Sequence, residues 1–174
     1  MIKIYGFRGK IQDIEHFLEE TSKIVNKGKQ IDFQVFDGEM IYGENHLISA
    51  YEHAKRAIKQ DENTCNSLAM EILLYASGER QLKQAIPKMG IKKNSGKIVF
   101  IFFNKKIGKK TMFDESLLDS ITETFSLKRD DKIIEGDINT LRKFGIEKKE
   151  TSTVSENEYG DLILERVAMV DLLK

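Results

Sequence analysis

The residue types that could carry out chemistry are sparse in this sequence, and their spacing assembles no complete catalytic set. His46 and His53 lie seven residues apart, which would place them on one face of a helix, but with His16 far away no third metal ligand accompanies them. The glycines around residues 6–9 match neither a phosphate-binding loop nor a dinucleotide fingerprint. No serine-centred nucleophile elbow is present either. The sequence therefore predicts no metal site, no cofactor and no catalytic residues.

Glu71 is the exception, because it is a carboxylate inside an almost wholly apolar run. Burial can tune such a group for acid–base work, and together with Arg80 and a histidine it could act on an anionic metabolite. A structural role, by pairing with Arg80 or by facing solvent from a helix, is favoured over this enzymatic one. Cys65 has no obvious base beside it and is interpreted as a plain thiol.

The segment from Leu68 to Ile91 is the most informative part of the chain. Its apolar first half ends at Ser77 and Gly78, after which a polar, arginine-bearing helix is expected. Ser77 is expected to cap the N-terminus of that second helix through its hydroxyl. Arg80 and Gln81 would then project from a helix N-terminus, where free amides favour anions such as phosphate or carboxylate.

Charge is unevenly distributed although the net charge is zero. Residues 80–113 contain basic side chains and no acidic one. Two interpretations remain open: a solvated lysine-rich surface, or a patch that faces phosphates together with Arg80. The basic residues of this stretch are Arg80, Lys83, Lys88, Lys92, Lys93, Lys97, Lys105, Lys106, Lys109 and Lys110.

Hydrophobic periodicity predicts the elements that must position these residues. Strands are expected over residues 2–7, 31–36 and 98–103, the last of them buried on both faces because it is continuously apolar. Helices are expected over residues 11–24, 45–60, 68–76, 79–86, 117–125 and 137–143, and after Ser155. Asp137 and Ser155 are expected to cap the last two of these helices. In the helix over residues 45–60, Ala50, Ala54 and Ala57 form a stripe that permits the close approach of another element. Residues 133–134 are ambiguous, and residues 147–153 are expected to form a loop. The pattern predicts an α/β (α+β) fold, with a small, mostly antiparallel or mixed sheet packed with several helices.

Length and composition point to one domain over residues 1–174. A single cysteine, no signal peptide and no run long enough to span a bilayer predict a cytoplasmic protein without membrane contact. Lysine- and glutamate-rich usage is compatible with a thermophilic, archaeal source.

The chain resembles a known family over most of its length and in the same order. It is similar to the kinase-binding small subunit (TPRKB family) of the KEOPS complex, which installs threonylcarbamoyl on the adenosine next to the tRNA anticodon. The matching pieces are residues 45–47 with Ala50, Ala54 and Ala57; 71–78 with Arg80 and Gln81; 85–86; 90–91; 141–146; and 164–168.

The resemblance implies a non-catalytic accessory subunit. Its partners would be the small atypical kinase/ATPase subunit and, in archaea, tRNA, recruited through the single-stranded 3′ CCA end. No DNA partner is expected.

Two sets of site residues follow as hypotheses. Charge and planar groups suited to single-stranded RNA predict an RNA-binding site, with Tyr75 either stacking a base or lying in the core. Its expected residues are Gly78, Arg80, Gln81, Lys83, Lys59, Lys55 and Arg56. The apolar C-terminus predicts the kinase interface, or alternatively part of the chain's own core; its residues are Leu162, Val167, Leu172 and Leu173.

Three functions are therefore compared. The leading one is the KEOPS accessory subunit; the others are a small enzyme acting on an anionic metabolite and a free-standing RNA-binding domain. The missing catalytic set counts against the enzyme, and the apolar C-terminus counts against a domain with no protein partner.

Overall fold

The computed structural model describes residues 1–27, 30–108 and 111–173. The chain divides into two compact units, each built from two separate stretches of sequence. Unit 1 comprises Met1–Gly38 and Ile91–Ile133, and unit 2 comprises Glu39–Gly90 and Ile134–Lys174. The prediction that residues 1–174 form one domain stays a prediction.

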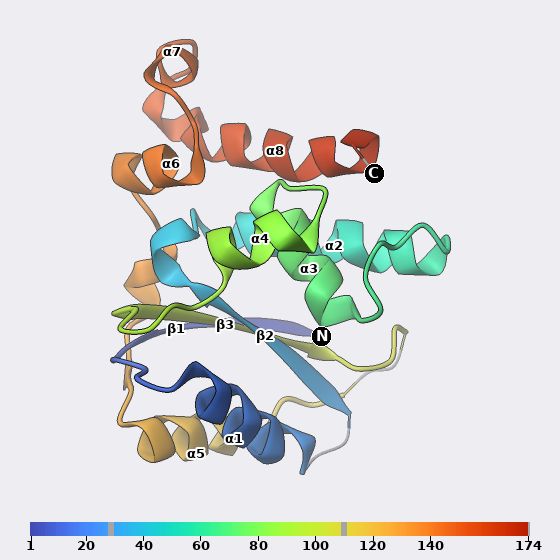
Figure 1. Cartoon of the computed structure of the whole chain (residues 1–174), viewed down its shortest axis with the longest axis vertical. Helices are drawn as coiled ribbons and strands as arrows, with labels where there is room; N and C mark the ends of the chain where they lie inside the picture. The colour runs from blue at the N-terminus through green and yellow to red at the C-terminus, as the bar shows by residue number, and fades with distance from the viewer. Residues whose placement is uncertain (28–29, 109–110, 174) are drawn as a thin grey trace. The chain divides into compact units, whose positions relative to one another are not determined.

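Unit 1 contains a four-stranded sheet with the order β2-β3-β1-β4 (Figure 1). Its strands are β1 (Ile2–Arg8), β2 (Ile31–Asp37), β3 (Lys97–Asn104) and β4 (Lys128–Arg129). All of these strand pairs are antiparallel. The α+β class and the antiparallel sheet are therefore confirmed. The continuous apolar run predicted to be a buried strand is β3, whose residues 98–104 are all buried.

Two helices, α1 (Ile14–Asn26) and α5 (Ser116–Phe125), lie side by side on one face of this sheet (Figure 1). Asp13 caps α1 by accepting a hydrogen bond from the backbone amide of His16 at 3.0 Å. Phe17 of α1 packs edge-on against both Phe100 of β3 and Phe125 of α5, with ring centroids 5.9 and 4.7 Å apart. This aromatic contact fixes the helices on the core of unit 1.

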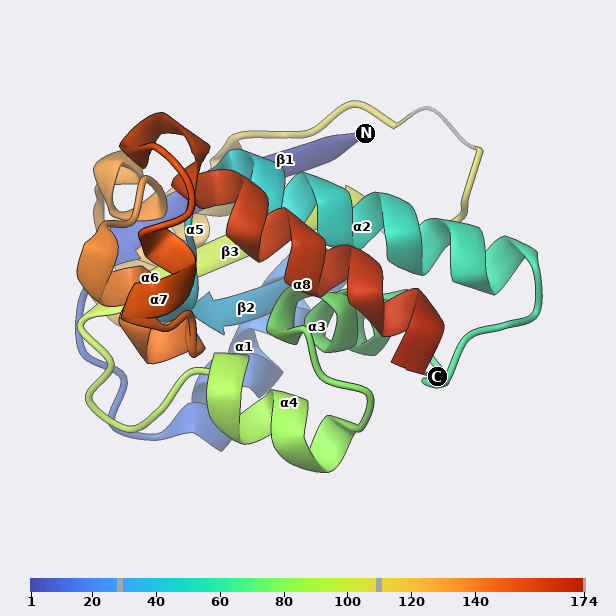
Figure 2. The same cartoon turned by 90° about the horizontal axis from the view of Figure 1, so that it is seen from above.

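Unit 2 is helical. Its helices are α2 (Glu44–Lys59), α3 (Leu68–Ser77), α4 (Leu82–Met89), α6 (Ile138–Phe144), α7 (Lys148–Thr151) and α8 (Tyr159–Leu173), with a 3₁₀ turn η3 (Glu156–Glu158). Figure 2 shows α8 beside α2 and α3, and α2 contacts both of its neighbours. The alanines of the predicted stripe, Ala50, Ala54 and Ala57, are all buried. Short 3₁₀ turns also occur at Gly38–Met40 (η1) and Asp131–Ile134 (η2).

Two local predictions in unit 2 are wrong. The expected loop at residues 147–153 contains the four-residue helix α7, which begins with a capping box between Glu147 and Glu150. Ser155 caps η3 rather than the last helix, and α8 begins only at Tyr159. Asp137, by contrast, caps α6 as predicted, accepting the amides of Asn139 and Thr140.

No helix within the described residues combines the length and the apolar content that a membrane crossing requires.

Candidate functional site

The turn between α3 and α4 holds the residues predicted to bind an anion. Gly78 ends α3 with a φ of 67°, a left-handed conformation that favours glycine. A Cβ at this position would lie 3.2 Å from the Cβ of Arg166 in α8. Gly78 is therefore required both by its backbone conformation and by the close approach of α8.

The prediction that Ser77 caps the following helix is wrong. Ser77 is the last residue of α3 and is fully buried, and its hydroxyl donates to the carbonyl of Leu74 at 2.6 Å. The same hydroxyl accepts the amide of Glu79 at 3.1 Å, so it supports the turn. The N-cap of α4 is Gln81, whose side chain makes no capping hydrogen bond. The first-turn amides of α4 are thus left without a side-chain cap beside Gln81.

Some of the predicted RNA-binding cations form ion pairs within the chain and others do not. Within the described chain, Arg80 and Lys83, near the start of α4, and Lys59, at the end of α2, are exposed and form no ion pair. Lys55 pairs with Glu52 at 2.5 Å. Arg56 pairs with Asp171. Three of the predicted cations are therefore available to a ligand, and two are already neutralised.

The basic stretch 80–113 is divided between the two units. Arg80, Lys83 and Lys88 belong to unit 2, and Lys88 pairs with Glu79 at 3.0 Å while its ammonium lies 4.1 Å above the ring of Phe144. The lysines at positions 92, 93, 97, 105 and 106 belong to unit 1, and those at 109 and 110 lie outside the described residues. The suggestion that this stretch and Arg80 form one surface stays a prediction.

Asp171 organises a polar cluster that the sequence did not reveal. Its carboxylate accepts hydrogen bonds from the hydroxyl of Tyr75 at 2.5 Å and from the guanidinium of Arg56 at 2.6 Å. The Nδ1 atom of His53 lies 2.8 Å from Asp171 and 2.7 Å from Arg56, so the ring donates to the carboxylate when Nδ1 is protonated and accepts from the guanidinium otherwise. The cluster joins α2, α3 and α8 within unit 2.

Tyr75 is a core residue and not a stacking platform. Its side chain is only 1% exposed, and burial together with the hydrogen bond to Asp171 raises the pKa of the phenol. Burial alone would raise the pKa of Asp171, but the hydrogen bonds from Tyr75, His53 and Arg56 outweigh it and lower that pKa. Asp171 is therefore a stable anion with all of these partners around it.

Glu71 has a structural role. Its side chain is fully buried and accepts backbone amides of the α2–α3 connection, from Cys65 at 2.8 Å and from Thr64 at 3.1 Å. The predicted structural role is thus correct, although the partners are backbone amides rather than Arg80. Backbone donors satisfy the charge of a carboxylate that would otherwise be costly to bury.

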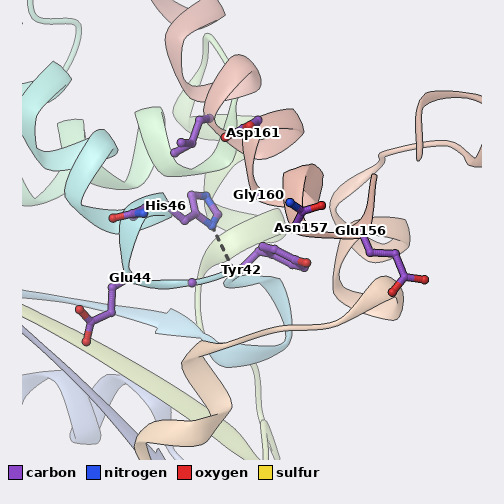
Figure 3. A pocket seen from close by; sticks show the side chains of 10 residues that line it. Tyr42, Glu44, His46, Glu156, Asn157, Gly160 and Asp161 are labelled. Atoms are coloured by element: carbon purple, nitrogen blue, oxygen red, sulfur yellow. Dashed lines mark hydrogen bonds between the residues drawn. The ribbon is translucent and has the colours of Figure 1, made fainter. Parts of the chain in front are cut away.

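His46 is a further buried titratable group in unit 2. Its Nε2 donates to the carbonyl of Ala76 at 2.7 Å, and its Nδ1 accepts the amide of Tyr42 at 3.3 Å (Figure 3). With one nitrogen donating and the other accepting, the ring is neutral. Burial lowers its pKa to about 4. His46 therefore ties the start of α2 to the end of α3 as an uncharged hydrogen-bonding bridge.

We expect His46 to remain neutral on acidification while stability declines. Because its pKa falls from 6.5 in the unfolded chain to about 4 in the fold, its contribution is complete above pH 6.5 and is lost as pH falls from 6.5 towards 4. The slope approaches about 1.4 kcal/mol per pH unit in this window. NMR titration of the histidine ring protons, with exposed His16 as the internal control, and urea unfolding at pH 7 and pH 5.5 measure both effects. A His46 midpoint near 6.5 would contradict the expectation.

A pocket of about 520 Å³ lies beside His46, where the N-terminal ends of α2 and α8 meet (Figure 3). Its lining residues include the carboxylates of Glu44, Glu156 and Asp161 and neither a lysine nor an arginine. Such a lining repels phosphate, and none of the predicted RNA-binding residues contributes to it. Among the residues that the structure describes, no three His, Cys, Asp or Glu side chains gather as metal ligands.

The predicted kinase-interface residues fall into two groups. Leu162 and Val167 face the interior, with exposures of 8% and 0%. Leu172 and Leu173, in the last turn of α8, are 77% and 43% exposed. The first pair serves the core of unit 2, which was the alternative interpretation. The second pair is free to contact a partner, and its assignment to an interface stays a prediction.

Comparison with known proteins gives the family. The model of the kinase binding protein CGI-121 family matches residues 11–171. The chain belongs to the CGI-121 family. The "Regulatory protein Cgi121" of Methanocaldococcus jannaschii is 26% identical over 156 residues, which cover 88% of this chain and 92% of the relative.

Membership of the CGI-121 family confirms the predicted resemblance to a kinase-binding subunit. It also confirms the prediction that the chain is not an enzyme, because the family is one of binding proteins and the relative is a regulatory protein. In a CGI-121 protein, Glu71 and His46 need no catalytic explanation, and their hydrogen bonds supply a structural one.

Proposed function

We propose that this chain is the accessory subunit of a KEOPS-type complex, which binds an atypical kinase/ATPase and helps recruit tRNA for threonylcarbamoyladenosine modification. The match to the kinase-binding family over residues 11–171 supports the kinase half of the proposal. Because tRNA is the substrate of such a complex, we propose a cytoplasmic location and neither a membrane nor a DNA partner.

The observation that carries the RNA half is the group of unpaired cations in unit 2. Arg80 and Lys83 flank the start of α4, whose first-turn amides lack a side-chain cap. Lys59 is also exposed, and it follows the paired residues Lys55 and Arg56 on α2. Phosphate oxygens are suited to this combination of free amides and cations. The planar groups of Arg80 and Gln81 can also contact the bases of an unpaired strand.

The part of the tRNA that this site recognises is expected to be the single-stranded 3′ CCA end. A single-stranded end exposes both its base faces and its phosphates. The turn at Gly78 presents a short, narrow set of donors, which suits such an end better than it suits a long duplex. We therefore expect tRNA lacking its CCA end to bind more weakly than intact tRNA.

Arg80→Ala is expected to weaken tRNA binding about tenfold at physiological salt and to reduce the salt slope by about 0.7, because one phosphate contact is lost. Fluorescence anisotropy of labelled tRNA, with and without its CCA end, measures both quantities. Arg142→Ala is a matched control, since Arg142 is an exposed arginine of α6 in the same unit. Equal losses of affinity in the two variants would show that the effect comes from net charge and not from this site. An unchanged affinity of Arg80→Ala would reject the site.

A further inference from the structure

The carboxylate of Asp171 links Arg56 of α2 to the last turn of α8. Asp171 lies in the last turn of α8, directly before the exposed leucines, and its Oδ2 accepts the guanidinium of Arg56 at 2.6 Å. Arg56 is 49% exposed and Asp171 is 36% exposed, so the pair lies at the surface of unit 2. A phosphate arriving from solvent can therefore compete with Asp171 for Arg56.

The position of Asp171 on its helix is unfavourable without these donors. The C-terminal end of a helix carries partial negative charge, which disfavours a carboxylate in the last turn. Val170, fully buried, is the last apolar anchor of α8, and Leu172 and Leu173 beyond it are exposed. The bonds from Tyr75, His53 and Arg56 are thus what holds the final turn against α2 and α3.

We propose that Asp171 is an internal anion that occupies Arg56 in place of an RNA phosphate, so that the last turn of α8 gates one cation of the RNA-binding surface. When a partner displaces this turn, Arg56 becomes available to phosphate, and RNA bound at Arg56 in turn favours the displaced turn. The inference rests on the proposed function, which places RNA on the cations of unit 2, and on the predicted contact of the kinase with Leu172 and Leu173 at the end of α8.

The ion pair between Arg56 and Asp171 is expected to lower RNA affinity, because it occupies a cation that could otherwise bind phosphate. Two of the remaining predicted cations, Arg80 and Lys83, form no ion pair in the described chain, whereas the guanidinium of Arg56 is neutralised. Lys55, next to Arg56, is also neutralised, but by Glu52 of its own helix, which no partner of α8 would move. The gate therefore acts on Arg56 and leaves Lys55 unchanged.

An RNA-free measurement tests the gate directly. Inorganic pyrophosphate is titrated into the full chain, and the side-chain Nε–H signals of Arg56 and Arg80 are followed by NMR. In the wild type, Arg80 is expected to respond and Arg56 is not. In Asp171→Asn, which keeps an oxygen to accept the Tyr75 hydroxyl but loses the charge, Arg56 is expected to respond as well. An equal response of Arg56 in the wild type, or none in the variant, would overturn the proposal.

The tRNA measurement then separates the gate from the proposed function. Asp171→Asn is expected to raise tRNA affinity about fivefold and to steepen the salt slope by about 0.7, as one further phosphate contact forms. Arg56→Gln combined with Asp171→Asn should remove this gain. A gain that persists without Arg56 contradicts the gate. A pyrophosphate response at Arg56 with no tRNA binding by either protein leaves the gate standing and rejects the RNA function.

The thermal stability of each variant is measured before its binding. Should Asp171→Asn unfold, the wild-type comparison of Arg56 with Arg80 still decides the proposal, because it needs no substitution. Tyr75→Phe is the matched control, since it removes one hydrogen bond to Asp171 and leaves its charge on Arg56. Because the bond from Arg56 remains, the gain in phosphate or tRNA binding is expected to be smaller than that of Asp171→Asn, and an equal gain would assign the effect to loosening of the fold.

Discussion

Leu172→Glu is expected to lower affinity for the atypical kinase at least 100-fold, about 3 kcal/mol, without unfolding the chain. The side chain is 77% exposed, so the free protein tolerates a carboxylate there. In a complex the same carboxylate would be buried without a partner in an apolar contact, which is costly. Isothermal titration of the purified kinase measures the loss, and circular dichroism of the variant checks the fold.

Met112→Glu is the matched control for the kinase experiment. Met112 is another exposed apolar side chain, 93% accessible, but it belongs to unit 1 and lies outside the proposed interface. Its substitution should leave kinase affinity within twofold. If Leu172→Glu and Leu173→Glu behaved like this control, the last turn of α8 would not be the kinase-binding surface. Leu162 and Val167 cannot serve in this test, because both are buried and their substitution would damage the core.

Glu71→Ala is expected to lower the free energy of unfolding by about 3 kcal/mol and the melting temperature by roughly 10 °C. The substitution removes a buried acceptor and leaves the buried amide of Cys65 without the carboxylate that it donates to. The connection between α2 and α3 would lose its anchor as well, since Thr64 donates to the same side chain. Denaturant unfolding measures the free energy, and differential scanning calorimetry measures the melting temperature.

Glu52→Ala provides the comparison for Glu71. Glu52 lies on α2, is 52% exposed, and pairs with Lys55 three residues later. Surface pairs of this kind contribute about 0.5 kcal/mol or less. A loss of stability no larger in Glu71→Ala than in Glu52→Ala would show that the buried carboxylate does not hold the connection.

Much of the fold could be predicted because its strongest elements carry local signals. Ile98–Phe103 is continuously apolar and rich in β-formers, and it is the central strand β3. The apolar run from Leu68 could have been a strand, but its Ala, Met, Glu and Leu content favoured the helix that is found as α3. β4 could not be predicted, because Lys128 and Arg129 have no strand pattern of their own and are ordered by pairing with β1.

Local spacing predicted less of the candidate site. It identified Gly78 and Arg80 correctly as a turn with an exposed cation, because glycine and charge are visible in the sequence. It missed Asp171, whose partners Arg56 and Tyr75 lie about a hundred residues earlier in the chain. The available signal was a carboxylate in the last turn of a helix, where the macrodipole disfavours it. Ser77 was assigned to the wrong helix because a serine before a glycine can end one helix as readily as it can begin another.

The interleaved course of the chain has a consequence for synthesis. β1 leaves the ribosome about a hundred residues before its main partner, because Ile2 pairs with Phe103, and Arg8 pairs later still with Lys128. At 5–20 residues per second, the first strand waits roughly 5–20 s for its main partner. During this time its apolar side chains have no completed sheet to join, which leaves them open to non-native contacts. Since each unit also needs two separate stretches of sequence, no continuous fragment of the gene encodes a complete unit without carrying part of the other.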